Sequence, residues 1–238
     1  MRIEKRFENQ LKALGAKTNP RQEQVFEKYC HLLSHWNEFM NLTGITEKEE
    51  VYEKHFLDSL SVVKLLDMRE VQRVLDVGTG AGFPGIPLKI VFPHLQVVLL
   101  DSLRKRVDFL EKAVRELGLE SVCCVHARAE DLAREEDYRQ GFDLVVSRAV
   151  ADLAVLSEYA LPFVERGGSF VAYKSIHAGE EVEKSSAAIE LLGGQIKEKT
   201  IFQLPGTKIN RMLLRIEKVS DTPIEYPRRA GKPLKKPL

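Results

Sequence analysis

The amino-acid sequence predicts an α/β protein in which a doubly wound, parallel sheet follows an N-terminal helical extension. Two observations support this. Apolar residues recur at three- and four-residue spacing before residue 67, and from Arg73 onward short apolar runs alternate with helical stretches. A length of 238 residues suits one large domain with a modest appendage. We expect the helical extension at 1–68, the sheet-containing domain at 69–220, and a basic C-terminal tail at 221–238.

Three helices are expected in the extension. The longest covers Pro20–Met40, where apolar side chains recur at helical intervals, and a second covers Glu47–Leu66. A shorter helix is expected at Ile3–Leu14. Apolar stripes with this spacing usually pack into a core, so we expect these helices to pack against the rest of the chain.

The sheet-forming part begins near Arg73. Its expected strands are Val74–Val77, Val97–Leu100, Val122–Val125, Leu144–Val146 and Ser169–Ala172, with later candidates at Lys197–Phe202 and Met212–Ile216. The helices expected between them are Leu103–Leu117, Leu153–Val164 and Gly179–Leu192. Strands that alternate with helices of this length form βαβ units, which build a parallel sheet covered on both faces.

Composition narrows the class of protein. Hydrophobic residues make up 44% of the chain and charged residues 30%, as in globular proteins with a buried core. No apolar run reaches the ~20 residues that span a bilayer, and residues 1–6 lack the apolar centre of a signal peptide. Cys30, Cys123 and Cys124 match no metal-site spacing, and we expect the last two to lie in the core. These features favour a cytoplasmic protein that binds neither a metal nor a membrane.

A glycine-rich loop follows the first predicted strand. From Asp76 to Gly85 the sequence reads Asp-Val-Gly-Thr-Gly-Ala-Gly-Phe-Pro-Gly. Glycine lets the backbone turn sharply and approach a ligand, so Gly78 and Gly80 are candidate cofactor contacts. The dinucleotide fingerprint has its third glycine where Phe83 stands, which separates this loop from that of nicotinamide enzymes. Pro84 suits an early helical position because proline has no N–H to leave unpaired.

An acidic residue ends the second predicted strand. Asp101 lies nineteen positions after Gly82, and a carboxylate there can accept both hydroxyls of a ribose. With Asp76 and the glycine loop, it forms a pattern that looks like that of class I methyltransferases. The alternatives are a nicotinamide enzyme or a tight β–α turn without a ligand. After the third strand, Glu130 or Asp131 either accepts from an adenine amino group or simply stabilises a helix start.

The end of the fourth strand, where this fold presents substrate-facing residues, reads Ser147-Arg148-Ala149. Enzymes that methylate exocyclic amines usually place an acid or amide before Pro-Pro and an aromatic residue there, and enzymes that methylate cytosine C5 need a nucleophilic cysteine. The sequence has neither device. Guanine N7 needs neither, because it offers a free lone pair and no proton has to leave. The protein then supplies orientation and charge stabilisation, and Arg148 is the candidate catalytic residue; a structural ion pair is the alternative.

Motifs outside the glycine loop follow the pattern of one known family. They are Trp36-Asn37, Asn41-Leu42-Thr43, His55-Phe56, Asp58-Ser59-Leu60, Asp101-Ser102, Ala129-Glu130, Ser147-Arg148-Ala149, Tyr226-Pro227-Arg228, Gly231, Pro233, Lys235, Pro237 and Leu238. With the glycine loop, they make the chain resemble, over essentially its whole length, the bacterial small-subunit rRNA guanine-N7 methyltransferase family, also called glucose-inhibited division protein B.

This resemblance implies N7 methylation of one guanosine in 16S rRNA, with S-adenosyl-L-methionine as the cofactor. The substrate would be 16S rRNA or a small-subunit assembly intermediate, and we expect the chain to act as a monomer. The resemblance also implies cofactor contacts from Gly78, Phe83, Asp101, Ser102, Leu103, Ala129, Glu130 and Arg148.

Two of these motifs can be interpreted from their residues alone. His55 and Asp58 share a helix face, so they either line the mouth of the cofactor site or hydrogen-bond to each other. From Arg228 to Leu238 the tail carries five basic residues without an acid, and prolines and a glycine would keep it extended. Such a segment would neutralise several RNA phosphates; a solvated basic tail is the alternative. The five are Arg228, Arg229, Lys232, Lys235 and Lys236.

Other functions remain open from the residues alone. A methyltransferase acting on a small molecule or a protein would turn over without RNA. A non-enzymatic RNA- or nucleotide-binding protein is disfavoured by the intact acids and glycines of the loop. A nicotinamide dehydrogenase is disfavoured by Phe83.

Overall fold

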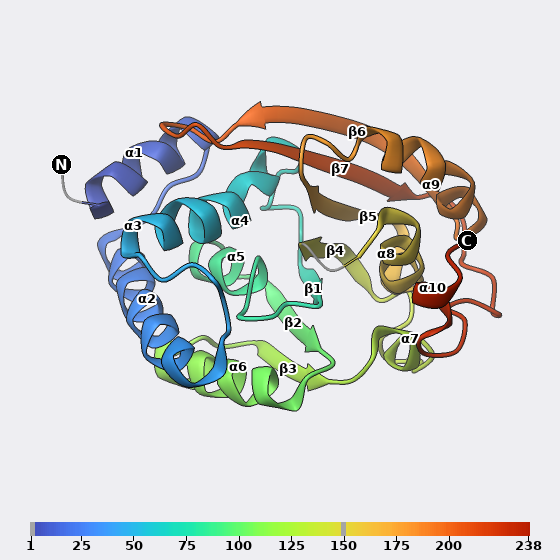
Figure 1. Ribbon diagram of the computed structural model, residues 1–238, viewed down its shortest axis with the longest axis horizontal. Helices are drawn as coiled ribbons and strands as arrows, with labels where there is room; N and C mark the ends of the chain where they lie inside the picture. The colour runs from blue at the N-terminus through green and yellow to red at the C-terminus, as the bar shows by residue number, and fades with distance from the viewer. Residues whose placement is uncertain (1–2, 149–150) are drawn as a thin grey trace.

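The computed structural model describes residues 3–148 and 151–238 and places a seven-stranded sheet between two layers of helices (Figure 1). The strand order is β3-β2-β1-β4-β5-β7-β6. The strands are β1 (Arg73–Val77), β2 (Gln96–Asp101), β3 (Val122–His126), β4 (Phe142–Arg148), β5 (Val164–Lys174), β6 (Gly194–Gln203) and β7 (Asn210–Lys218). Ala149 of the fourth-strand motif lies outside the described residues.

The prediction of a doubly wound α/β fold is confirmed. Strands β1 to β5 run parallel, with Asp76 of β1 opposite Leu99 of β2 and Val146 of β4. The prediction of an entirely parallel sheet is wrong for β7, which runs antiparallel to both of its neighbours, β5 and β6. Only residues 204–209 separate β6 from β7, too few for the crossover that a parallel pair requires, so the two strands form a hairpin.

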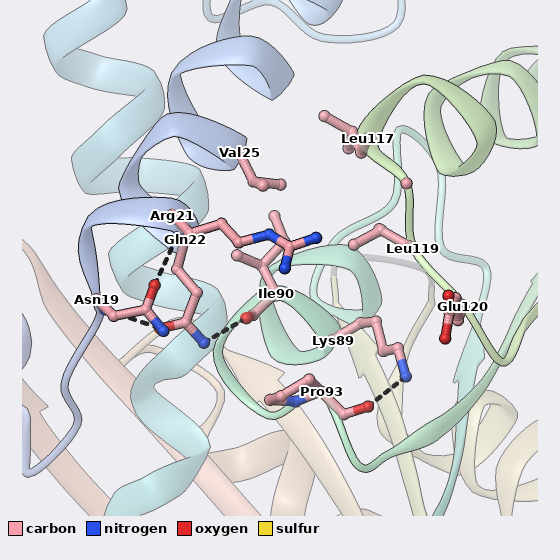
Figure 2. Close-up of a pocket in the computed structure, with 11 residues that line it drawn as sticks. Asn19, Arg21, Gln22, Val25, Lys89, Ile90, Pro93, Leu117, Leu119 and Glu120 are labelled. Carbon is pink, nitrogen blue, oxygen red and sulfur yellow. Dashed lines mark hydrogen bonds between the residues drawn. The ribbon is translucent and has the colours of Figure 1, made fainter.

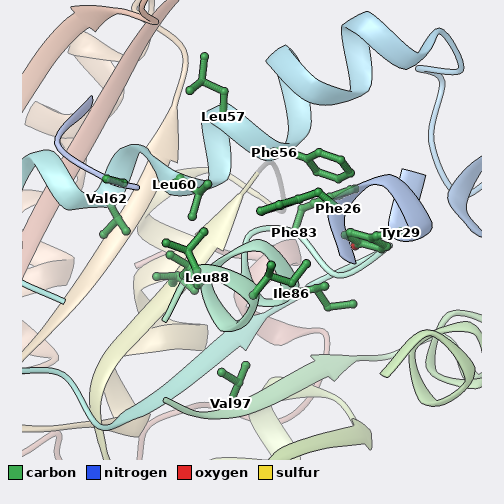
Figure 3. Packing of buried hydrophobic residues seen from close by; sticks show 14 of the residues in the cluster. Phe26, Tyr29, Phe56, Leu57, Leu60, Val62, Phe83, Ile86, Leu88 and Val97 are labelled. Atoms are coloured by element: carbon green, nitrogen blue, oxygen red, sulfur yellow. The ribbon is translucent and has the colours of Figure 1, made fainter. Parts of the chain in front are cut away.

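The core has two parts, one on each face of the sheet. Helices α1 (Ile3–Leu14), α2 (Pro20–Met40), α5 (Gly85–Val91) and α6 (Arg104–Leu117) contribute to the first part, and α8 (Leu153–Ala160) and α9 (Gly179–Leu191) to the second. Successive strand residues alternate between the faces, so in β4 Val146 joins the first part and Val145 the second. Figure 3 shows Phe26, Phe56 and Phe83 gathered in the first part.

The helical extension packs on the first face of the sheet. α1 and α2 have the predicted limits, and a capping box between Asn19 and Gln22 starts α2. The predicted helix Glu47–Leu66 is present as one continuous helical segment whose hydrogen-bond pattern changes along its length, in four consecutive pieces. These are α3 (Lys48–Val51), a π-helical turn (Tyr52–Leu57), α4 (Asp58–Leu60) and a 3₁₀ turn (Ser61–Lys64). π-helical turns often occur at functional sites.

Two further predictions are corrected. Cys123 is exposed and Cys124 only partly buried, because β3 is one of the two edge strands of the sheet and pairs with β2 alone. The C-terminal tail is not extended: it packs beside α8 and contains the short helix α10 (Lys232–Lys235). Among residues 3–148 and 151–238, no helix is long and apolar enough to cross a membrane.

Candidate active site

The predicted site residues come from the carboxyl ends of the parallel strands. The strand order reverses between β1 and β4, and ligands of doubly wound sheets bind at such a switch point. The hydroxyl of Ser147 donates to the backbone oxygen of Val77 at 2.7 Å and ties the ends of these two strands together. The glycine loop leaves β1 here, and Arg148 ends β4 beside it.

The carboxylate of Asp76 organises the glycine loop. Its Oδ2 accepts from the Thr79 hydroxyl at 2.6 Å and from the Gly85 N–H at 2.7 Å. The other oxygen, Oδ1, is buried without a hydrogen-bond partner among the described residues. Complete burial raises the pKa of Asp76 to about 7, although the bonds from Thr79 and Gly85 oppose this shift. An unpaired buried oxygen of this kind suits a donor supplied by a ligand.

Close packing explains one of the loop glycines. A Cβ added to Gly82 would lie 2.4 Å from Ile86 Cδ1 and 2.7 Å from the Tyr29 hydroxyl, and its φ of +98° already favours glycine. The Tyr29 hydroxyl donates to the backbone oxygen of Ala81, so α2 of the extension contacts the glycine loop directly. A Cβ on Gly80 would meet nothing within 4 Å, so only its φ of +63° favours glycine there.

Asp101 joins the loop after β1 to the turn after β2. Its Oδ2 accepts from the Gly80 N–H at 3.0 Å and from Arg106 at 3.3 Å, and its Oδ1 accepts from the Leu103 N–H at 2.9 Å. The sequence did not predict these bonds. Each carboxylate oxygen can accept more than one hydrogen bond, so the two oxygens keep some capacity for ribose hydroxyls.

A cavity of about 120 Å³ lies beside this turn. Five of the predicted cofactor residues line it: Gly78, Asp101, Ser102, Ala129 and Glu130. Its other lining residues are Val77, Leu100, Ala127, Arg128 and Tyr159. Leu103 is 43% exposed and does not line the cavity, but its backbone N–H donates to Asp101, which does. Tyr159, on α8, escaped prediction because it lies on a mostly apolar helix remote in sequence from the other lining residues.

Arg148 stands at the other end of the site and is held from three sides. Its guanidinium donates to the backbone oxygen of Lys54 at 3.1 Å, to Asp58 Oδ2 at 3.1 Å and to His55 Nδ1 at 3.1 Å. It also lies over the ring of Phe83, 5.0 Å from the ring centroid. The structural ion pair that the sequence left as an alternative is therefore present, and it involves a residue of the predicted site.

His55 and Phe83 stack against each other. Their ring centroids are 4.4 Å apart with an interplanar angle of 18°, and both side chains are buried. Burial, followed by the charge of Arg148, lowers the pKa of His55 to about 3, so its imidazole is neutral near pH 7. Because Nδ1 accepts from Arg148, the proton resides on Nε2, which lies 2.8 Å from the Thr43 hydroxyl.

Asp58 links three elements of the site. One oxygen accepts from Arg148, and the other accepts from Arg211 Nε on β7 at 2.9 Å. His55 and Asp58 are thus brought together through Arg148, in place of the direct bond that was one of the two alternatives for this pair. Arg211 was missed because its contact with Asp58 spans 153 positions of the chain, and no local pattern signals it.

The arrangement fits S-adenosylmethionine as the bound group. The site offers a buried acceptor on Asp76 that has no partner in the described part of the chain, a second carboxylate at Asp101 and a third at Glu130 beside the cavity. The expected cofactor presents donors of the matching kinds, namely an ammonium group, ribose hydroxyls and an adenine amino group. Glycine backbone between the first two carboxylates allows close approach.

A larger cavity, of about 370 Å³, lies elsewhere and contains none of the predicted site residues (Figure 2). It is bounded by the start of α2 and the C-terminal ends of α5 and α6, where Gln22 donates to the backbone oxygen of Ile90 at 2.7 Å. Helices of βαβ units run opposite to their strands, so these helix ends lie at the amino edge of the sheet, away from the switch point.

Comparison with known proteins identifies the family of the chain. A family model described as rRNA small subunit methyltransferase G matches residues 22–209. The protein of that name from Lachnoclostridium phytofermentans is 52% identical over 238 residues, covering 100% of this chain and 98% of the relative. The one from Exiguobacterium sibiricum is 47% identical over 235 residues and covers 99% of both chains.

Solved structures share the fold at low sequence identity. A predicted O-methyltransferase of Agrobacterium tumefaciens has a TM-score of 0.54 and 21% identity, covering 69% of this chain and 80% of its own. TYW2 of M. jannaschii, solved in complex with AdoMet, has a TM-score of 0.50 and 15% identity, covering 63% and 70%. At these identities the likeness concerns the fold alone.

Proposed function

Because the chain belongs to the rRNA small subunit methyltransferase G family, we propose that it transfers the methyl group of S-adenosylmethionine to N7 of a guanosine in 16S rRNA. The chain is an S-adenosylmethionine-dependent rRNA methyltransferase. The choice of N7 as the acceptor atom is the specific proposal, and it depends on the groups that surround Arg148.

The observation that supports N7 is that the titratable groups next to Arg148 already have partners. Both nitrogens of His55 are engaged, and both oxygens of Asp58 accept from arginines. An exocyclic amine would need a base to take its proton during or after attack, whereas N7 has no proton to lose. A site with its acid and imidazole committed therefore suits a ring nitrogen.

We assign the cofactor contacts to the two ends of the site. Bound S-adenosylmethionine supplies an activated methyl group on a sulfonium. Gly78 and Gly80 let the backbone approach it, Asp101 accepts from its ribose with Ser102 and Leu103 in the same turn, and Glu130, following Ala129, accepts from its adenine amino group. The ring of Phe83 is buried, and one of its faces lies against the guanidinium of Arg148. Any cofactor contact of Phe83 is therefore made by its backbone or its ring edge.

Arg148 is the proposed catalytic residue. A guanidinium fixed by His55, Asp58 and Phe83 can donate to guanine O6 or to the cofactor carboxylate and hold the reactants in line.

The RNA contacts are assigned in part to the tail. Arg229, Lys232, Lys235 and Lys236 are exposed and available for phosphates. Arg228 is excluded from this set, because it is paired with the buried carboxylate of Glu158. We further propose that the enzyme acts as a monomer in the cytoplasm, on 16S rRNA or a small-subunit assembly intermediate.

The test uses labelled S-adenosylmethionine and small-subunit RNA from a strain that lacks the gene, offered both as naked 16S rRNA and as subunit particles. Label should enter one guanosine. Borohydride reduction followed by aniline should then cleave the RNA at that position, which identifies the product as N7-methylguanosine. Label at an exocyclic amine or a ribose would refute the N7 assignment. Label without RNA would point to a small-molecule or protein substrate.

Two variants separate catalysis from RNA binding. Arg148→Ala should lower single-turnover methylation much more than RNA affinity. Replacing Lys235 and Lys236 with Gln should weaken RNA binding and reduce its log–log salt slope by about one per lost phosphate contact, while the rate at saturating RNA stays unchanged. A wild-type salt slope in the lysine variant would exclude these two residues from the RNA contact.

A further inference from the structure

The C-terminal segment lies directly behind the cofactor cavity. The backbone N–H of Gly231 donates to Glu130 Oε1 at 2.7 Å, and Glu130 lines the cavity while remaining only 4% exposed. The two residues are 101 positions apart in the chain. In Figure 1, α10 and the red C-terminal loop lie against α7 (Ala129–Leu132), the helix that carries Glu130, and α8.

A strong anchor holds this segment in place. The carboxylate of Glu158 on α8 is completely buried, and it accepts from the Arg228 N–H at 2.7 Å, from Nε at 2.9 Å and from a terminal guanidinium nitrogen at 2.6 Å. This fork-to-fork contact fixes both the position and the direction of the chain. On the α7 side, Arg139 donates to the backbone oxygen of Tyr226 at 2.9 Å.

We infer that Gly231 is a positioning residue of the cofactor site, whose N–H sets the orientation in which Glu130 accepts from the adenine amino group. This inference rests on the proposed adenine contact of Glu130. A carboxylate has about four acceptor positions, and one firm backbone donor restricts its rotation without using all of them. Since Glu130 is buried, its carboxylate also needs such a donor in place of water.

The geometry of Gly231 offers a clean way to move this donor. Its φ is +78°, and an added Cβ would meet nothing within 4 Å. A substitution therefore acts through the backbone conformation and not through a clash. Asparagine tolerates a positive φ, whereas a β-branched valine strongly resists it, so Gly231→Asn and Gly231→Val form a matched pair.

The experiment measures whether the protein still distinguishes an amino group on the purine. Calorimetry compares the affinities for S-adenosylhomocysteine and S-inosylhomocysteine, in which a carbonyl oxygen replaces the adenine amino group. The wild-type protein should prefer the adenosyl compound by about ten- to a hundredfold, the factor expected when a buried acceptor loses its donor. Gly231→Asn should keep this preference, Gly231→Val should reduce it below about threefold, and Glu130→Ala should abolish it.

A merely structural role would lower both affinities together and leave their ratio unchanged, and that outcome would overturn the inference. Equal affinities of the wild-type protein for the two compounds would overturn it as well, because Glu130 would then make no contact with the adenine amino group. A wild-type protein that bound neither compound would instead contradict the proposed function. If Gly231→Val fails to fold, Arg228→Lys keeps the charge but loses the forked contact with Glu158, and it should reduce the preference in the same way.

Discussion

Replacing Asp58 tests the idea that the helical extension holds the catalytic arginine. This carboxylate is 2% exposed and accepts from Arg148 at 3.1 Å and from Arg211 at 2.9 Å. It thereby links α4 of the extension to β4 and β7 of the sheet. Asp58→Ala removes both bonds and leaves two guanidinium groups without their shared partner.

The loss of stability can be worked out from the exposure of the groups. A hydrogen bond to a charged group contributes roughly 1.5–3 kcal/mol. The side chains of Arg148 and Arg211 are 14% and 27% exposed, so water can replace part of what Asp58 supplies, and the lower end applies to each bond. The sum is about 3 kcal/mol for Asp58→Ala, at the lower end of the ~3–5 kcal/mol seen when a buried ion pair is broken. Asp58→Asn keeps one accepting oxygen and should cost about half as much.

Urea unfolding measures these differences, and single-turnover methylation measures their effect on Arg148. Asp58→Ala should unfold at a lower urea concentration with an unchanged slope, and Asp58→Asn should fall between it and wild type. Asp58→Asn should also methylate more slowly while it binds S-adenosylhomocysteine normally. The matched control is Asp67→Ala, since Asp67 pairs with Arg69 at the surface, and its midpoint should not move. A wild-type midpoint and a wild-type rate for Asp58→Ala would refute this account of Arg148.

The glycine loop provides two further predictions. Gly82→Ala should prevent stable folding, since the new Cβ would overlap Ile86 and the Tyr29 hydroxyl. Gly80→Ala adds only backbone strain and should lower the free energy of unfolding in urea by about 1–2 kcal/mol. Equal losses of stability in the two variants would contradict this packing argument. The pKa of Asp76 is raised to about 7, so it is largely protonated below that pH in the free protein. Cationic S-adenosylmethionine favours the ionised form, so its affinity should fall as the pH drops below 7, and Asp76→Asn should show a flat pH profile by calorimetry.

Much of the fold could be predicted from local patterns. Helical spacing predicted α1 and α2, and alternating apolar runs located all seven strands within a few residues. The order of those strands in the sheet is not a local property. For this reason Cys123 was predicted to lie in the core, whereas it is exposed. A strand at the edge of the sheet and a strand at its centre have similar sequences, but only the central one is covered on both sides.

The limits of prediction at the site have the same origin. The loop glycines and Asp101 lie at the carboxyl ends of neighbouring parallel strands. Such ends always meet at one edge of the sheet, so the sequence could predict that these residues lie together. The partners of Arg148 and Glu130 come from distant segments, across 90 positions for Asp58 and 101 for Gly231. The basic tail was expected to be extended because its prolines disfavour regular structure, but the buried pair of Arg228 with Glu158 holds it against α8.

The helical extension therefore belongs to the proposed catalytic apparatus and does more than cover the sheet. It supplies the carboxylate and the neutral imidazole that hold Arg148, and the hydroxyl of Tyr173 on β5 donates to the backbone oxygen of Ser59 at 2.7 Å to keep those groups in register. A charged imidazole there would repel the guanidinium it now accepts from. Burial of His55 against Phe83 keeps the imidazole neutral near pH 7, so the packing of the extension and the orientation of the arginine depend on the same contacts.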